Sequence, residues 1–425
     1  MLRSLCYDPV PSVDVLVNTH VVPPLVKLLS CGNDDTEFQS AWALTNIASD
    51  STPHVDILIS SGAVPALVQM FNKARKWRNR EQAAWALSNI AADSCENRDL
   101  VLSYDIMLFL VKNLKVSKNM DFLRRGTCLM YSLVYGTPGP TFELVSSCFD
   151  CMYRLLHLED EEILSDACWA LSYVTYRGDE NKIDAVIQAG LVPRLVKLMY
   201  SKNKTIFTPS LRVIGDVVAG SSAQTQAVLD ADGLSAIRHL MEIKDLYADL
   251  LKTCCFTLSN IMGGTADQVD AVMESGICPL LFKLMKEGEP AVKKEATWAM
   301  VNALDQGNDQ HVISLIHEGI LDVLIGSLTS DDLQLVMLCL KGLRCSLKVG
   351  NNNSYGSRFI LLLESKLHFV KLLQNHTNVE VAQSAYSLLD LYQRKRTMAC
   401  AWVHSVWMKC RRDLHSSPAY HLVHV

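Results

Sequence analysis

The chain has 425 residues, of which 49% are hydrophobic and 20% are charged, and its formal net charge is −5. This composition excludes global disorder, because it supplies enough apolar material for a sizeable core. It also argues against a nucleic-acid-binding protein with a basic surface. A negative net charge suits basic partners if the Asp and Glu side chains cluster on one surface.

The N-terminal stretch, residues 1–16, has no apolar segment of signal-peptide type, and no window of the chain approaches 18 uninterrupted apolar residues. The 14 cysteines are scattered, many of them within apolar helical runs. We therefore expect reduced, buried thiols, with no cofactor and no metal site. Cys148 and Cys151 have the spacing of metal ligands, but no second pair follows at a suitable distance.

A nine-residue motif returns along the chain. It reads AWALTNIAS at Ala41–Ser49, AWALSNIAA at Ala84–Ala92, CWALSYVTY at Cys168–Tyr176, CFTLSNIMG at Cys255–Gly263 and TWAMVNALD at Thr297–Asp305. The aromatic residues of successive copies are 43, 84, 87 and 42 residues apart. The two double gaps predict two hidden copies, and these occur in register at Gly126–Val134 and Ser210–Val218.

Glycines keep the same period and each precedes an apolar run: Gly62, Gly190, Gly233, Gly276 and Gly319. A glycine suits a left-handed helix end, and proline suits the start of the next helix. Each unit is therefore predicted to contain a short helix, a tight turn, a second helix, a loop and a third helix that carries the motif. A period near 43 falls within the range of about 40–47 residues for HEAT and armadillo units, and three helices favour armadillo.

These patterns predict an all-α, armadillo-repeat solenoid with a right-handed superhelix. One such unit cannot bury its apolar face alone, so neighbouring units stack into a continuous core. We expect about nine units in residues 10–393, the last two degenerate, after a remnant of a first repeat at 1–9. Residues 394–425 are predicted to form a basic, poorly ordered tail, although its basic clusters could also occupy the groove as a pseudo-substrate.

The motif places an aromatic residue and an asparagine four residues apart, on one face of a helix. Repetition stacks them into two parallel rows. Adjacent indoles can hold the methylene stem of a lysine and attract its ammonium, at about 0.5–2 kcal/mol each. An asparagine can bond the backbone of an extended peptide whatever its side chains are. Asp93, Asp166 and Glu295 are placed to receive lysine heads.

The alternative is that these tryptophans only pack in the core, since a tryptophan at helical spacing is more often core than binding site. In-register repetition with Asn46, Asn89, Asn260 and Asn302 favours a groove, because unpartnered buried asparagines would be costly in every repeat. The sequence contains no recognisable Ser/His/Asp or Cys/His combination typical of a catalytic site, so we expect no enzyme activity.

The sequence resembles the importin-α (karyopherin-α) family at Gln39–Ser49, Ala167–Thr175, Thr208–Gly220 and Leu372–Val381. The resemblance covers roughly residues 10–393. It implies an adaptor of nuclear import that shuttles between cytoplasm and nucleus, binds lysine-rich nuclear localisation signals and passes cargo to importin-β. An export receptor is a further implied partner; no nucleic acid or membrane is implied.

By position, the resemblance implies two peptide-binding sites. The major site would comprise Trp42, Asn46, Gln82, Trp85, Asn89, Asp93, Asp166, Trp169 and Tyr173. The minor site would comprise Arg212, Phe256, Asn260, Glu295, Trp298 and Asn302.

The chain also departs from the family's pattern. Cys128 and Ser132 stand where the family has Trp and Asn, so we expect this repeat to contribute less to binding at the major site. Phe256 replaces a Trp, so we expect the minor site to bind more weakly than is usual in the family. The family's basic, importin-β-binding N-terminal segment is expected to be lacking, which makes importin-β binding doubtful. Two alternatives therefore stay open: a truncated or degenerate relative that sequesters cargo, and an armadillo scaffold without a transport role.

Overall fold

The computed structural model describes residues 20–177, 180–244, 246–347, 360, 364 and 366–415, with side chains as far as Thr397. The expected first-repeat remnant at 1–9 lies outside these ranges. Within them the chain forms helices, turns and loops without any strand, which confirms the all-α armadillo architecture. The chain divides into two compact units, one ending at His239 and the other beginning at Leu240.

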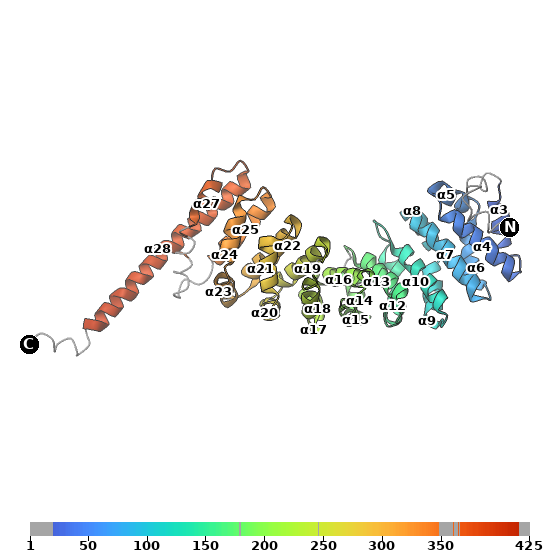
Figure 1. The fold of residues 1–425 in the computed structure, drawn as a ribbon, viewed down its shortest axis with the longest axis horizontal. Coiled ribbons are helices and arrows are strands. Elements are labelled where there is room, and N and C mark those ends of the chain that lie inside the picture. The colour runs from blue at the N-terminus through green and yellow to red at the C-terminus, as the bar shows by residue number, and fades with distance from the viewer. Residues whose placement is uncertain are drawn as a thin grey trace, which may run out of the picture. The chain divides into compact units, whose positions relative to one another are not determined.

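Three-helix repeats fill the first unit (Figure 1). In a well-formed repeat two short helices, α5 and α6, precede a longer one, α7, as the sequence predicts. The helices of this unit are α3 (Val22–Leu28), α4 (Asp34–Ala48), α5 (Thr52–Ser60), α6 (Ala63–Lys73), α7 (Trp77–Asp93), α8 (Cys95–Leu102), α9 (Ile106–Val116), α10 (Met120–Val134), α11 (Phe142–Val145), η1 (Ser146–Cys148), α12 (Phe149–Leu156), α13 (Glu161–Thr175), α14 (Glu180–Gln188), α15 (Val192–Leu198), α16 (Lys204–Val218) and α17 (Ser222–Asp230).

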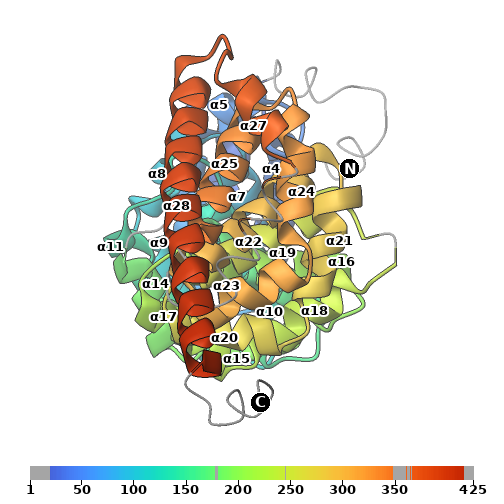
Figure 2. The same cartoon turned by 90° about the vertical axis from the view of Figure 1, so that its left-hand side faces the viewer.

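The second unit continues the pattern. Helix α18 (Gly233–Met241) crosses the division, and the helices after it are α19 (Ala248–Met262), α20 (Ala266–Glu274), α21 (Cys278–Glu287), α22 (Pro290–Gln306), α23 (Asp309–His317), α24 (Ile320–Gly326), η2 (Ser327–Thr329), α25 (Leu333–Ser346), α27 (Leu367–Leu373) and α28 (Val379–His415). Helix α28 is one continuous element (Figure 2). The boundary expected at Gln393 between repeats and tail therefore does not coincide with a helix end.

Local sequence explains where the helices begin. Asn33 caps α4 by accepting from the backbone N–H groups of Asp35 and Thr36, and Asp160 caps α13 in the same way. Ser221 and Gln224 form a reciprocal capping box at the start of α17. Prolines in the first turns of α3, α15 and α21 suit the one part of a helix where a missing N–H costs nothing.

The turn between the first two helices of a repeat requires a residue with the left-handed backbone conformation, in which φ is positive. Gly62, Gly190, Gly276 and Gly319 supply it, as expected, but Gly233 does not. Asp232 adopts the left-handed conformation instead, with φ of 62°, and its carboxylate accepts a hydrogen bond from Ser235 Oγ at 2.6 Å. Gly233 begins α18, where a Cβ would lie only 2.5 Å from Val228 Cγ1, so close packing requires glycine there.

The third helices of the repeats, which we call the ladder helices, pack in sequence order within each unit. They are α4, α7, α10, α13 and α16 in the first unit and α19, α22, α25 and α28 in the second. Their motif leucines, such as Leu44, Leu87 and Leu258, are fully buried. This packing leaves the opposite face of each ladder helix to carry the motif's aromatic and amide side chains.

No single helix in the described ranges is long and apolar enough to cross a membrane. Two sharply bent helix pairs, Thr52–Ser60 with Ala63–Lys73 and Asp309–His317 with Ile320–Thr329, reach that threshold together, on length and composition only.

Candidate functional site

The motif aromatics lie on the exposed faces of their ladder helices. Trp85, Phe256 and Trp298 are 37%, 41% and 40% exposed, while Ala86 and Ala299 beside them in sequence are completely buried. Trp42 and Trp169 are half-buried. Large apolar side chains with this exposure do not fill the core, so they are available to a ligand.

The motif asparagines connect neighbouring ladder helices. Asn89 Nδ2 donates to the backbone oxygen of Thr45 at 3.2 Å, and Asn302 Nδ2 donates to that of Ser259 at 2.9 Å. Each bond uses one amide hydrogen and leaves the side-chain oxygen for another partner. The asparagines therefore hold the ladder together and still present a polar group along it.

Two motif asparagines keep an unused donor. Asn46 Nδ2 and Asn260 Nδ2 are buried and have no hydrogen-bond partner within the described parts of the chain. An unpaired buried donor costs about 1–3 kcal/mol, so a backbone oxygen of a bound peptide would relieve that cost.

Gln82, which the resemblance implies as a major-site residue, is almost completely buried between two ladder helices. It is only 5% exposed, and its Nε2 donates to Thr45 Oγ1 at 2.7 Å. The structure thus places Gln82 between α4 and α7, where it supports the packing of the two ladder helices and offers little surface to a ligand.

Asp93 ends α7 as a half-buried carboxylate. One oxygen accepts from Thr52 Oγ1 at 2.8 Å, and the other accepts from Asn97 Nδ2 at 2.9 Å. These neutral donors fix the carboxylate without cancelling its charge, and each oxygen retains a lone pair. Asp93 can therefore receive a cationic head.

Asp166 lies in a more enclosed acidic cluster. Its pKa is raised from the usual 3.8 to about 6, mainly by burial and in part by the neighbouring Glu162, whereas Arg125 opposes the shift. Burial also raises the pKa of Glu81. Carboxylates whose charged form is disfavoured by burial gain most from an added cation, so this cluster favours a positively charged ligand.

A cation of the protein itself already lies in this cluster. The Arg125 guanidinium is 4.1 Å from the centre of the Trp85 ring and 4.0 Å from a Glu162 oxygen. The sequence pattern did not identify Arg125. The only available signal was two consecutive arginines, Arg124 and Arg125, one helical turn before the position of the missing Trp, Cys128.

Aromatic rings gather around Tyr173, which the resemblance implies as a site residue. The ring centres of Tyr131 and Tyr135 lie 5.9 and 4.8 Å from that of Tyr173, and Trp169 lies 6.4 Å away. Tyr131 and Tyr135 were missed from the sequence. Tyr131 lies in the last turn of α10 and Tyr135 directly follows that helix, and their ring centres are 5.6 Å apart. These four rings form an aromatic cluster between α10 and α13.

Arg212 belongs to this first unit, although the resemblance implies it for the minor site. Its guanidinium lies 5.4 Å from the Trp169 ring centre. Asp216, one turn later, accepts from Thr175 Oγ1 at 2.8 Å, and burial raises the pKa of Asp216 to about 6. The remaining minor-site residues, Phe256, Asn260, Glu295, Trp298 and Asn302, are in the second unit.

In the second unit, Glu295 lies one turn before Trp298 on α22. Burial raises the pKa of Glu295, and Lys252 and Lys294 oppose that shift. Exposed Phe256 and Trp298 on neighbouring helices give this site two aromatic faces and one half-buried acid. It is chemically similar to the first-unit site but holds fewer aromatic side chains.

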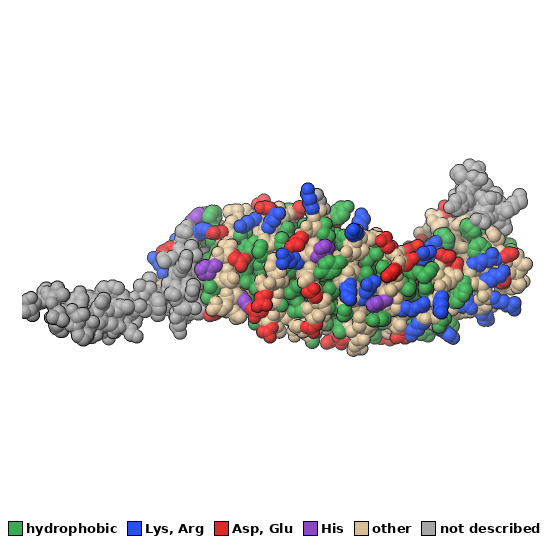
Figure 3. Space-filling model, turned by 60° about the horizontal axis from the view of Figure 1, so that its bottom comes forward, with side chains coloured by type: hydrophobic (Ala, Val, Ile, Leu, Met, Phe, Trp, Pro, Cys, Tyr) green, Lys and Arg blue, Asp and Glu red, His purple; other side chains and the backbone are tan. Residues whose placement is uncertain are grey.

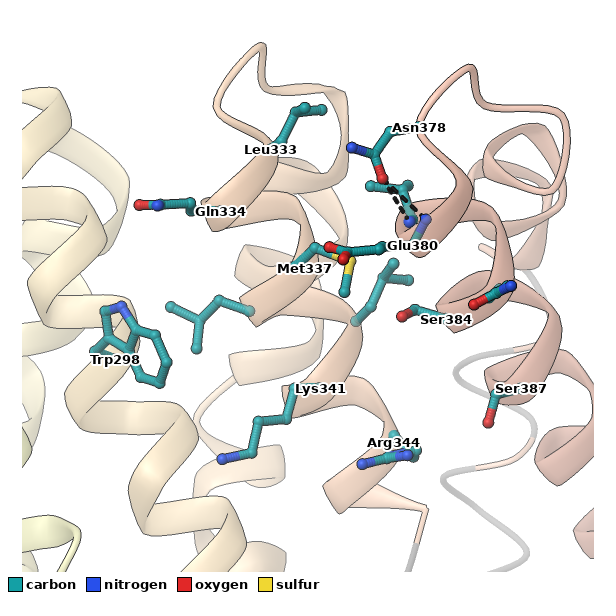
Figure 4. Close-up of a pocket in the computed structure, with 14 residues that line it drawn as sticks. Trp298, Leu333, Gln334, Met337, Lys341, Arg344, Asn378, Glu380, Ser384 and Ser387 are labelled. Carbon is teal, nitrogen blue, oxygen red and sulfur yellow. Dashed lines mark hydrogen bonds between the residues drawn. The ribbon is translucent and has the colours of Figure 1, made fainter.

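A groove of 820 Å³ adjoins Trp298 between α22, α25 and α28 (Figure 4). Its lining combines apolar side chains, among them Leu333 and Met337, with Lys341, Arg344 and Glu380. The degenerate α25 repeat thus contributes a hollow surface, which its poor match to the motif did not predict.

Charged groups are interspersed with apolar ones over the face drawn in Figure 3, rather than separated into large areas of one sign. In the described ranges, no cluster of three or more His, Cys, Asp or Glu side chains could hold a metal ion.

Comparison with known proteins places this ladder in context. The family model described as Armadillo/beta-catenin-like repeat matches residues 9–49, 51–92, 179–216 and 265–305. The chain is 37% identical to importin subunit alpha-1a of Oryza sativa subsp. japonica, over 92% of this chain and 75% of that protein. It is 36% identical to importin subunit alpha-4 of Arabidopsis thaliana, over 92% and 74%. Among solved structures, an engineered protein with 24% identity aligns with a TM-score of 0.81, over 92% of this chain and 93% of that one, which supports the fold.

Proposed function

Because the chain belongs to the importin-α family, we propose that it is a nuclear import adaptor whose ladder binds lysine-rich localisation signals as extended peptides. The family consists of transport adaptors rather than enzymes, in agreement with the absence of a catalytic pattern in the sequence. In this proposal the protein shuttles between cytoplasm and nucleus and passes its cargo to the importin-β pathway.

The observation that carries the proposal is the pairing of exposed indoles with half-buried carboxylates. Trp85 and Trp298 present exposed indoles, although Arg125 lies over one face of Trp85, and Asp166 and Glu295 lie one turn before a ladder aromatic with pKa values raised by burial. A lysine satisfies both groups at once, because its stem packs on the indole and its ammonium stabilises the charged carboxylate. A groove for acidic ligands would instead be lined with lysine and arginine, as the scaffold alternative requires.

The amide row supplies affinity that does not depend on peptide sequence. Among the described residues, Asn46 and Asn260 each keep a buried Nδ2 donor without a partner, and Asn89 and Asn302 each retain a side-chain oxygen. An extended peptide has one N–H and one C=O per residue and can pair with both kinds of group. Lysine recognition and backbone recognition therefore use separate rows of the same helices.

Calorimetry of the full chain with a lysine-rich peptide tests the proposal. We expect micromolar or tighter binding, and a loss of most of that affinity when the lysines are replaced by alanine. Equal affinity for both peptides would remove the basis for this function.

The transfer of cargo needs its own experiment. Capture of importin-β by the full chain, loaded with the same peptide, is the outcome that transport requires. A chain that binds the peptide but captures no importin-β would instead act as the sequestering relative considered above.

A further inference from the structure

The ladder changes chemical character after Trp298. Lys341 comes 43 residues later and takes the motif's aromatic position in α25. Its ammonium pairs with Asp305 of α22 at 2.9 Å. Where another lysine-binding wall would stand, the chain therefore supplies a cation of its own.

Arg344 adds a second cation, three residues further along α25. It is exposed, lines the 820 Å³ groove and forms no ion pair with any residue in the described ranges. Figure 4 shows Lys341 and Arg344 in the lower part of the groove, with Glu380 of α28 above them. Because Lys341 is already neutralised by Asp305, Arg344 is the cation available to a ligand.

Apolar surface lies beside these charges. Leu333 is 41% exposed, and Met337 is half-buried one turn before Lys341. The groove is continuous with Trp298, which lines it. A peptide whose lysine lies on Trp298 beside Glu295 would thus extend its next residues over an apolar floor that leads to Arg344.

We propose that this groove is a subsite for an acidic residue that flanks the lysine-rich segment of the cargo peptide. The inference rests on the proposed function and names a feature of its substrate. An arginine beside apolar surface binds a carboxylate through paired N–H groups, whereas a lysine there would meet the like charge of Arg344. The acidic side chain points to Arg344, away from the like charge of Glu380.

Flanked peptides and the full chain provide the test. One lysine-rich core is extended by Asp-Asp, Ala-Ala or Lys-Lys, at its N-terminal or its C-terminal end, and affinities are measured by calorimetry. We expect the Asp-flanked peptide to bind about three-fold tighter than the Ala-flanked one at one of the two ends, and the Lys-flanked peptide to bind weakest. Arg344→Glu should reverse this order.

The matched control is Lys371→Glu, which introduces the same charge change at an exposed position of α27 outside the groove. It should preserve the order found with the unmodified chain. Because both variants change the charge by the same amount, an effect of net charge alone appears in both of them.

The possible outcomes separate the inference from the function on which it rests. Binding of all peptides with equal affinity, or an order unchanged by Arg344→Glu, overturns the acidic subsite alone. An order reversed equally by Lys371→Glu also overturns it, because the effect would then follow net charge. If no lysine-rich peptide binds the full chain, the proposed function fails, and the subsite with it.

Discussion

Arg125 limits the access of a ligand to Trp85 in the first unit. Arg125 lies over the indole and next to Glu162, and it lowers the pKa of Asp166. These are the groups that a cargo lysine would use. In the proposed function, the chain's own guanidinium would therefore compete with a cargo lysine at Trp85.

Arg125→Ala should therefore tighten binding of a lysine-rich peptide, by about two- to five-fold for an exposed cation–π contact. The control is Arg124→Ala, which removes the neighbouring guanidinium that pairs with Asp160 at 2.8 Å. Calorimetry on both variants provides the comparison. Unchanged or weaker binding by Arg125→Ala would show that this arginine does not compete with cargo.

The raised pKa of Asp166 predicts a pH dependence with opposite signs for binding and folding. Below pH 6 the carboxyl becomes neutral, so lysine binding should weaken as the pH falls from 7.5 to 5.5, about two- to five-fold.

The folded chain holds this proton more tightly than the unfolded chain. This group's contribution therefore stabilises the fold as the pH falls from about 6 to about 4.

Asp166→Asn separates the two effects. It should reduce the pH dependence of peptide affinity over that range, and it should raise the free energy of unfolding at pH 7.5, because the buried charge is gone. Fluorescence titrations at several pH values measure the first effect and urea denaturation measures the second. A variant with the full pH dependence of the unmodified chain would locate the titrating group elsewhere.

Asp93→Lys should be the most damaging charge change for cargo binding. It replaces the carboxylate held by Thr52 and Asn97 with a like charge for the incoming lysine, and reversing one partner of a buried pair costs about 2–5 kcal/mol. Asp56→Lys, at an exposed position of α5, is the matched control. Normal affinity in folded Asp93→Lys, checked by circular dichroism, would contradict the assignment.

At the scale of single helices, the close contact of α25 with α22 and α24 depends on one glycine. A Cβ at Gly342 would lie 2.8 Å from Val301 Cγ2 and 2.9 Å from Leu324 Cδ1, both of which belong to buried residues. The degenerate repeat that carries Lys341 and Arg344 thus packs more tightly than its weak motif implies.

Gly342→Ala should lower the free energy of unfolding by about 1 kcal/mol, since overpacking outweighs the better helix propensity of alanine. Gly326→Ala is the control, because a Cβ there meets nothing within 4 Å; it should be neutral or stabilising by about 0.5 kcal/mol. Chemical denaturation compares the two. A stabilising Gly342→Ala would mean that α25 can shift freely.

At the scale of the whole molecule, a repeat array is stabilised mainly by contacts between neighbours. Ladder helices pack in sequence order within each unit, α22 with α25 and α25 with α28. Strain introduced at Gly342 should therefore remain local.

Hydrogen exchange tests that locality. In Gly342→Ala we expect faster amide exchange in α22, α24, α25 and the first turns of α28, with no change in α4 and α7 of the first unit. Uniformly faster exchange along the chain would instead indicate that both units unfold as one cooperative block.

The repeat and its three-helix unit could be predicted from sequence alone, because a 43-residue period with paired Trp and Asn leaves few other architectures. The family came from the resemblance of particular segments, such as Gln39–Ser49. The sequence also named Trp85, Trp298, Asn89 and Asn302 as ladder residues, which the structure places on exposed or half-buried faces.

The contacts of individual side chains could not be predicted from the sequence pattern, because they depend on how the helices pack. Gln82 turned out to be buried against Thr45, and Arg125 proved to cover Trp85, because both positions depend on the neighbouring ladder helix about 40 residues away in sequence. Asp232 replaced Gly233 as the left-handed residue because helix packing against Val228 required the glycine one position later. Periodicity identifies the face on which a residue lies, whereas burial, pairing and charge are set by the helices packed against that face.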